Sequence, residues 1–338
     1  MKNFVPLTVV VLFIFLIVVV LAQLSGSSKE DGRVYSVGII ARGSAYEQAI
    51  EGYKKRMTEL GYEEGLNIIY DVRIVLDKDQ LSGVVREFIA KDVDLIHTYS
   101  TPATQAAYKE TKDIPRPIPV VFGSMGDPII SGVIKDIQRP GTNVTGVASL
   151  STELTSKRLE ILKQIDPGIE RVAMPYTSKE LKDVAADKSV EIAKKTADYL
   201  KINLILFPVT SEEDNKVVAE KITGDLVEGV VFGGDSLVWS GAGAYIQQAI
   251  KERIPLVSSS VEQAKSGALI GIGVDYSVSG IQSADITNKI LRGGDPSKIP
   301  VQLPEKILLV VNMKTAQQIG IKFNMEFLSQ VDLIISDD

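Results

Sequence analysis

The chain contains no cysteine and only one histidine, and these two shortages exclude several kinds of chemistry. Without cysteine there is no disulfide, no iron–sulfur cluster, no cysteine nucleophile and no zinc site built on cysteine. A Ser-His-Asp triad would have to use His97, which lies inside an apolar run typical of a buried structural histidine. The sequence also lacks a GxxxxGK[ST] loop, a GxSxG elbow and the spaced glycines of a dinucleotide site. We therefore expect no catalytic residues, no metal and no cofactor.

Excess positive charge is also missing. The 37 Lys and Arg residues are outnumbered by 43 Asp and Glu residues, and the formal net charge is −6. With no long basic run, the chain has no electrostatic footprint for nucleic acid, so a DNA or RNA partner is not expected. The 338 residues, 45% of them hydrophobic, are enough for about two globular domains.

One long hydrophobic run is present near the N-terminus, where residues 4–24 carry no charge. It is long enough to span a bilayer and exceeds the apolar core of about 7–15 residues found in ordinary secretory signals. We interpret residues 1–24 as a signal peptide or membrane anchor, with the anchor favoured, and residues 25–33 as a polar linker. Ser27 stands where a lipoprotein would carry its lipidated cysteine, so no lipid is expected there. Either interpretation places the folded part outside the cytoplasm.

Short β-branched runs alternate with amphipathic segments from residue 34 onward, which predicts parallel sheets covered by helices. The first series has predicted strands at 34–40, 67–75, 94–99 and 120–123, with helices at 45–60, 80–90 and 102–109. After an irregular stretch at 139–146, the second series has predicted strands at 172–175, 204–209, 230–233, 256–258 and 268–274, with helices at 153–164, 184–200, 215–226, 242–252 and 278–291. The pattern predicts an α/β fold of two doubly wound parallel-sheet lobes.

Polar residues follow several predicted strands, at the sheet edge where α/β proteins bind ligands. Thr101 can cap a helix that opens at Pro102, and the free N-terminus of such a helix attracts a carboxylate. Three further strand ends carry Asp127, Asp235 and Asp275. Each aspartate alone is more typical of a cap than of a ligand contact, but together they indicate a cleft shared by two lobes. Trp239, shortly after Asp235, offers a stacking surface.

A series of short strings runs in order along residues 37–335: ELGY at 59–62, EGLN at 64–67, VDLI at 93–96, TPA at 101–103, GDP at 126–128, NVTGV at 143–147, GAL at 267–269 and GVDY at 273–276. In this order and spacing they resemble the ABC-transporter substrate-binding proteins, a family that includes binders of tryptophan and tyrosine. The resemblance implies a type I periplasmic-binding-protein fold, in which two lobes joined by three crossovers close on a small ligand. One lobe would comprise residues 34–147 plus about 275–304, and the other residues 148–274 plus about 305–338.

The resemblance also implies a function and a site. It implies an extracytoplasmic solute-binding protein that delivers an amino acid or similar small molecule to an ABC permease in the membrane. Ser100 and Thr101 stand where the family presents its carboxylate-binding helix start. Asp127, Asp235 and Asp275 stand where it places cleft aspartates.

Two segments that border the cleft in this family differ here, so the ligand need not be an aromatic amino acid. Residues 41–46 are shorter than the family's loop and contain Arg42 and Tyr46, while residues 174–179 contain Tyr176 in place of an Asn-Pro loop. Arg42 has no family counterpart, and it is either a carboxylate clamp or a surface charge. A ligand-sensing ectodomain that acts through a separate membrane receptor would use the same fold. An exported enzyme is disfavoured, because no nucleophile, base and metal arrangement is present.

Overall fold

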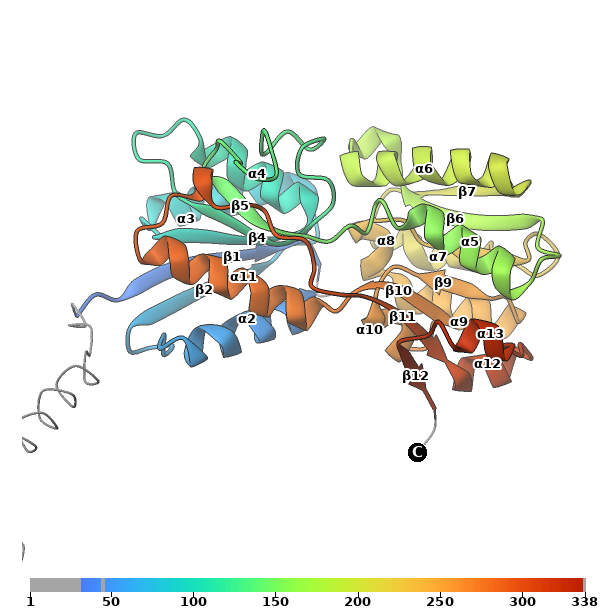
Figure 1. Ribbon diagram of the computed structural model, residues 1–338. Coiled ribbons are helices and arrows are strands. Elements are labelled where there is room, and N and C mark those ends of the chain that lie inside the picture. Colours follow the sequence, from blue (N-terminus) through green and yellow to red (C-terminus); the bar gives the residue numbers. More distant parts are fainter. Residues whose placement is uncertain (1–31, 44–45, 337–338) are drawn as a thin grey trace, which may run out of the picture.

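The computed structural model describes residues 32–43 and 46–336, which form two α/β lobes lying side by side (Figure 1). The first lobe has a five-stranded sheet of order β2-β1-β3-β4-β5, and the second a seven-stranded sheet of order β12-β11-β10-β9-β8-β6-β7. The predicted α/β class with two lobes is therefore confirmed. The apolar helix expected in residues 1–24 lies outside the described residues.

All strand pairs of the first sheet are parallel, and the strands are β1 (Tyr35–Ala41), β2 (Ile68–Ile74), β3 (Leu95–Tyr99), β4 (Val120–Met125) and β5 (Val144–Ala148). The helices of this lobe are α2 (Glu47–Glu59), α3 (Leu81–Ala90), α4 (Thr101–Thr111) and α11 (Tyr276–Leu291), with the short 3-10 turns η2 (Lys78–Gln80) and η4 (Pro296–Lys298). Strand β5 begins inside the stretch that the sequence left as an irregular connection. Part of its burial comes from α11 and η4, which arrive more than 100 residues later in the chain, so local sequence alone does not mark its full extent.

Side chains of the first sheet alternate between two helical layers. Val37 and Ile39 pack with α2 and α11, whereas Ile40 packs with α3 and α4. Helices α2 and α11 cross closely at two glycines. A Cβ on Gly280 would stand 2.0 Å from the carbonyl oxygen of Ala49, and one on Gly52 would stand 2.4 Å from that of Ser277. These glycines let α11, which follows the second sheet in sequence, pack onto the first sheet.

The strands of the second sheet are β6 (Arg171–Thr177), β7 (Asn203–Val209), β8 (Gly229–Val231), β9 (Leu256–Ser258), β10 (Ile270–Val274), β11 (Ile307–Asn312) and β12 (Leu333–Ile335). Its helices are α5 (Thr155–Ile165), α6 (Val184–Leu200), α7 (Asp214–Glu220), α8 (Ser236–Ser240), α9 (Ala242–Glu252), α10 (Val261–Lys265), α12 (Met313–Ile319) and α13 (Met325–Leu328), with the 3-10 turn η3 (Lys179–Leu181). One pair departs from the predicted parallel order, since β11 runs antiparallel to β10. The chain leaves β10 for the first lobe and returns into β11 beside the same end, so Val274 pairs with Ile307.

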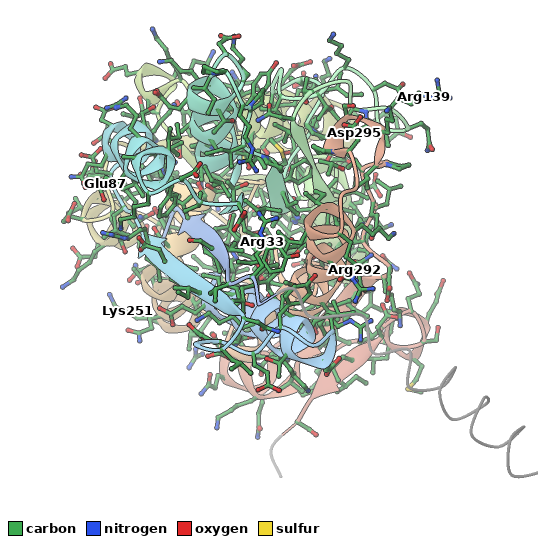
Figure 2. All side chains as sticks on the ribbon, turned by 90° about the vertical axis from the view of Figure 1, so that its left-hand side faces the viewer. Arg33, Glu87, Arg139, Lys251, Arg292 and Asp295 are labelled. Atoms are coloured by element: carbon green, nitrogen blue, oxygen red, sulfur yellow. The ribbon has the colours of Figure 1, made fainter. Side chains whose placement is uncertain are left out.

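Three connections join the lobes: residues 149–154 between β5 and α5, Asp275 between β10 and α11, and residues 299–306 between η4 and β11. Charged side chains project around the outside of the molecule, as Glu87, Arg139 and Lys251 do in Figure 2. Within residues 32–43 and 46–336, none of the helices combines the length and the apolar character needed to cross a membrane. Buried charges are the exception, and Arg42, Asp183 and Asp235 are buried where the lobes meet.

Candidate functional site

A cleft lies between the lobes, at the carboxyl ends of strands from both sheets, and its empty space, open solvent included, is about 420 Å³. Hydroxyl-bearing and aromatic side chains dominate its lining, which includes Tyr46, Ser100, Thr101, Ser124, Ser151, Thr152, Asp183, Asp235, Ser236, Trp239, Ser259 and Tyr276. Five of the residues expected at a site from the sequence are in this lining: Tyr46, Ser100, Thr101, Asp235 and Trp239. The structure thus brings together residues that are up to 193 positions apart, from Tyr46 to Trp239.

The N-terminus of α4 opens on the cleft. Ser100, not Thr101 as the sequence indicated, is its N-cap, and the Ser100 hydroxyl accepts a hydrogen bond from the Ala103 amide at 3.3 Å. Thr101 instead ties this turn to the end of β4, because its hydroxyl accepts from the Gly126 amide at 3.2 Å. Ser100 has a φ of 92°, an uncommon value for a residue with a side chain. The buried start of a helix carries partial positive charge and suits a carboxylate.

Aromatic rings from both lobes form one cluster in the cleft. The ring of Tyr46 lies with its centroid 5.2 Å from that of Trp239, 5.5 Å from that of Tyr276 and 5.7 Å from that of Tyr99. Burial raises the pKa of Tyr46 well above its usual value and raises that of Tyr276 to about 12, so both phenols are neutral at physiological pH. The sequence pointed to Tyr46 and Trp239 but not to the side chain of Tyr276.

The three aspartates predicted at strand ends all act as caps, and only one of them lines the cleft. Asp127 accepts from the amides of Ile129 and Ile130, both at 2.9 Å, and Asp275 caps α11 by accepting from the Ser277 amide at 2.9 Å. Neither residue is in the lining of the cleft.

Asp235 does line the cleft, but its oxygens are already occupied. Oδ2 accepts from the Thr177 amide at 2.5 Å, and Oδ1 accepts from the Thr177 hydroxyl at 2.7 Å. The same Oδ1 caps α8 through the amides of Leu237 and Val238. Burial, followed by the nearby Asp183 carboxylate, raises the pKa of Asp235. Asp235 therefore braces β6 against α8 at the wall of the cleft.

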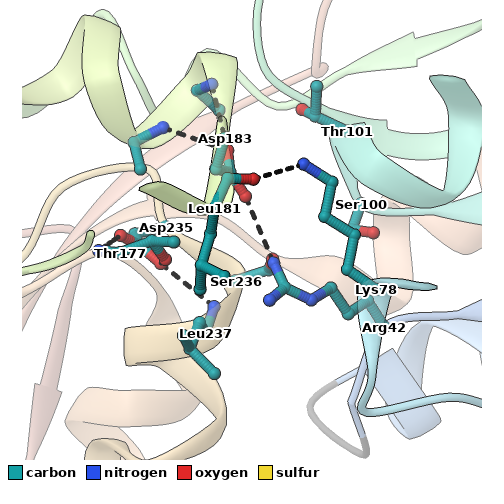
Figure 3. Close-up of polar contacts among 12 residues, drawn as sticks. Arg42, Lys78, Ser100, Thr101, Thr177, Leu181, Asp183, Asp235, Ser236 and Leu237 are labelled. Atoms are coloured by element: carbon teal, nitrogen blue, oxygen red, sulfur yellow. Dashed lines mark hydrogen bonds and ion pairs between the residues drawn. The ribbon is translucent and has the colours of Figure 1, made fainter. Parts of the chain in front are cut away.

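Arg42 lies across the boundary between the lobes, buried beside the cleft (Figure 3). Its Nη1 donates to Oδ2 of Asp183 at 3.2 Å and to the Ser236 hydroxyl at 3.3 Å. Asp183 was missed by sequence reasoning, and its only local signal is its position as the N-cap of α6. Tyr176, the last of the predicted residues, is half-buried in β6 against the core of the second lobe and does not line the cleft.

The buried hydroxyl oxygen of Thr152 in this lining has no hydrogen-bond partner within the part of the chain that the structure describes. Two glycines that follow the ends of β4 and β8 flank it: a Cβ on either Gly126 or Gly234 would stand 2.8 Å from this oxygen. Larger residues at these two positions would fill the space beside the Thr152 hydroxyl. Burial of a hydroxyl group costs free energy unless a hydrogen-bond partner reaches it. In the part of the chain that the structure describes, no group of three or more acidic or histidine side chains could hold a metal ion.

The sequence model of the ABC transporter substrate binding proteins matches residues 36–334. The chain belongs to this family. A tyrosine-binding protein from Clostridioides difficile is 25% identical to this substrate-binding protein over 318 residues, which are 89% of each chain. The ABC domain in complex with L-Trp from Streptococcus pneumonia superposes with a TM-score of 0.80 at 22% identity, over 89% of this chain and 100% of that chain.

A ligand-free, open structure is also similar to this substrate-binding protein. It is a substrate-binding protein with adhesive properties from Clostridium difficile, with a TM-score of 0.62, 24% identity, and coverage of 90% of this chain and 100% of that one. These likenesses confirm the periplasmic-binding-protein fold expected from the sequence. The family is one of solute binders rather than enzymes.

Proposed function

We propose that this chain is the extracytoplasmic substrate-binding protein of an ABC importer, and that its lobes close by hinge motion on an amino acid or similar zwitterion. The observation that carries the proposal is the start of α4, which lines the cleft between the lobes together with an aromatic cluster. A helix N-terminus and a set of rings are complementary to the two ends of an aromatic amino acid. Two relatives support this chemistry, one named a tyrosine-binding protein and the other solved with L-Trp.

The ligand carboxylate is assigned to the first lobe. Ser100 and Thr101 are buried at the start of α4, and their hydroxyls hold the turn in shape through the amides of Ala103 and Gly126. A turn that is already fixed loses little conformational entropy when an anion binds. The carboxylate would gain charge-assisted hydrogen bonds there without a dedicated arginine.

The ligand side chain is assigned to the aromatic cluster. Tyr46 comes from the first lobe and Trp239 from the second, while Tyr276 follows the connection at Asp275. A planar side chain among these rings would touch both lobes at once, which favours their closure. The ammonium group is assigned to the wall of the cleft at Thr152, whose buried hydroxyl oxygen has no partner among the described residues and is free to accept.

Hinge closure is supported by the arrangement of the lobes. Only three short connections join them, and the overall superposition is closer with the L-Trp complex than with the open, ligand-free structure, at TM-scores of 0.80 and 0.62. Closure is also the usual motion of two-lobed binding proteins. The permease would then receive the closed, loaded form, with residues 1–24 as signal peptide or anchor and residues 25–33 as the tether.

Isothermal titration with L-tyrosine and L-tryptophan tests the proposal. We expect one of them to bind reversibly with one equivalent per chain, and we expect the matching amine, which lacks the carboxylate, to bind on the order of a hundredfold more weakly. Gly234→Ala should reduce affinity by about tenfold or more, because its methyl group would stand 2.7 Å from the Thr152 amide nitrogen.

Gly243→Ala is the matched control, since nothing lies within 4 Å of a Cβ at that position. It should bind as the wild type does. Equal affinity for the amino acid and its amine would contradict the carboxylate assignment, and equal affinity of the Gly234→Ala and Gly243→Ala variants would remove the cleft as the binding site.

A further inference from the structure

We infer that Arg42 and Asp183 form a latch across the cleft, an ion pair that lets the lobes close while both partners are present and opposes closure when only one remains. Their role is positional: they set how much of the protein is closed, and through that they set ligand affinity. The part of this inference that concerns affinity rests on the proposed function, whereas the part that concerns the distance between the lobes does not.

The two charges belong to different lobes. Arg42 directly follows β1 of the first lobe, and Asp183 directly precedes α6 of the second, 141 positions later. The ion pair joins Nη1 and Oδ2 at 3.2 Å, and the side chains are only 5% and 2% exposed. Both charges therefore leave water when the lobes meet, and separation of the lobes would return both of them to water.

A buried ion pair of this kind is sensitive to the loss of one partner. Its Coulomb energy roughly offsets the cost of removing both charges from water, but a single charge left behind has no such compensation. The Nε of Arg42 is also buried, and it has no hydrogen-bond partner in residues 32–43 and 46–336. The intact pair therefore contributes little net stability to the closed form. Removal of one partner strongly favours opening of the lobes.

A second cation of the first lobe binds the same segment. Lys78, in η2, donates from Nζ to the carbonyl oxygens of Leu181 at 2.6 Å and of Lys182 at 3.0 Å (Figure 3). These carbonyls immediately precede Asp183, so residues 181–183 receive two cations from the opposite lobe. We call residues 181–183 the latch segment.

The surroundings of Arg42 and Asp183 indicate that the pair does not bind the ligand directly. Arg42 is absent from the lining of the cleft and faces a small adjoining recess with Leu76 and Ser236. Asp183 has its second oxygen committed to the amides of Ala185 and Ala186. With both side chains directed at each other or at helix α6, the pair acts on the ligand through closure.

The absence of cysteine makes the distance between the lobes directly measurable. Spin labels on Lys109→Cys in α4 and Lys194→Cys in α6 would be the only thiol-linked labels, and both positions are exposed. Electron–electron double resonance on the ligand-free protein should give a short and a long distance, in proportion to the closed and open forms. Arg42→Met or Asp183→Asn should shift the population to longer distances, while the double variant Arg42→Met/Asp183→Asn should restore the short one.

Asp183→Asn keeps the capping ability of residue 183, so α6 stays intact. Two further variants make the distances interpretable. Lys78→Met weakens the latch without changing the buried pair. Arg171→Met is the control, because it breaks the Arg171–Glu228 ion pair within the second lobe and should leave the distance unchanged. Unchanged distances in Arg42→Met, Asp183→Asn and Lys78→Met, or a double variant more open than either single variant of the pair, would overturn the latch.

Affinity for L-tyrosine or L-tryptophan supplies the second readout. Each single variant of the ion pair should bind on the order of a hundredfold more weakly, whereas the double variant should lie within about tenfold of the wild type. Additive losses would overturn the latch. If the wild type binds neither amino acid, the proposed function fails for these ligands, and the distance measurement still decides the latch.

Discussion

Replacement of Arg158 by methionine is expected to lower the free energy of unfolding by about 4 kcal/mol. Arg158 lies on α5, is 0% exposed, and is among the largest fully buried side chains described. Burial lowers the pKa of its guanidinium to about 9, which still leaves it protonated at neutral pH. Among the described residues no carboxylate bonds to it directly, so its charge is held by backbone carbonyl groups and by the Ser151 hydroxyl.

These carbonyls belong to three segments that meet beneath the cleft. Nη1 donates to Ser151 at 2.7 Å and to Phe232 at 3.3 Å, while Nε and Nη2 donate to Ile272 at 3.3 and 3.2 Å. Ser151 lies in the first connection between the lobes, and Ile272 lies in β10 just before the second. Methionine would fill much of the space but would remove the hydrogen bonds that the three carbonyl groups receive from the guanidinium, and each buried bond lost costs about 1–3 kcal/mol.

Urea unfolding of the two proteins measures this effect. Arg86→Met is the matched control, because Arg86 is 61% exposed and pairs only at the surface with Glu110; it should change the free energy of unfolding by about 0.5 kcal/mol or less. A loss below about 1 kcal/mol for Arg158→Met would mean that these hydrogen bonds do not hold the connections in place.

Mild acid is expected to destabilise the protein through His97. Burial between Tyr53 and Tyr99 lowers the pKa of this side chain from 6.5 to about 3. The Ser283 hydroxyl donates to the Gly280 carbonyl and so accepts from Nε2 of His97, while Nδ1 has no partner. The folded protein therefore keeps His97 neutral at pH values where an unfolded chain would protonate it.

The direction of the pH effect follows from proton counting. Between pH 6.5 and about 3 the unfolded state binds more protons at this residue than the folded state, so stability is full above pH 6.5 and falls as the pH decreases. From about pH 7.5 to about pH 5 the contribution of His97 should fall by about 2 kcal/mol. His97→Gln removes this titrating group. Over the same pH range, the free energy of unfolding of the variant should decrease by about 2 kcal/mol less than that of the wild type. Equal losses in the two proteins would show that His97 is not held neutral.

Much of the fold was predictable because it depends on local periodicity. Strand β3 was expected at 94–99 and is found at Leu95–Tyr99, and the helix expected at 184–200 is α6 itself. The predictions were wrong where contacts between residues distant in the sequence determine the structure. Helix α7 ends at Glu220 instead of near 226, because the chain turns at Thr223 and Gly224 and packs that glycine beside Glu252. The antiparallel β11 depends on the path of the chain through the other lobe.

The site was predictable only where a local signal coincides with a position in the cleft. The Ser-Thr-Pro sequence at 100–102 marks a helix start, and a helix start at a strand end lies where ligands bind. The same reasoning could not tell that Asp127 and Asp275 cap their own helix or turn outside the cleft, while Asp235 lies in its wall. The pairing of Arg42 with Asp183 has no signal in the sequence, because it forms only when two separately folded lobes meet.

Native mass spectrometry of the protein purified from its own host tests the central claim most directly. A solute-binding protein should carry one small molecule per chain with the mass of an amino acid or close analogue, and Gly234→Ala prepared in parallel should carry less of it. After denaturation the released molecule should have an unchanged mass, and it should rebind to the emptied wild-type protein. Conversion of that molecule to a product on incubation with the protein, or equal occupancy of the wild type and the Gly234→Ala variant, would contradict the account.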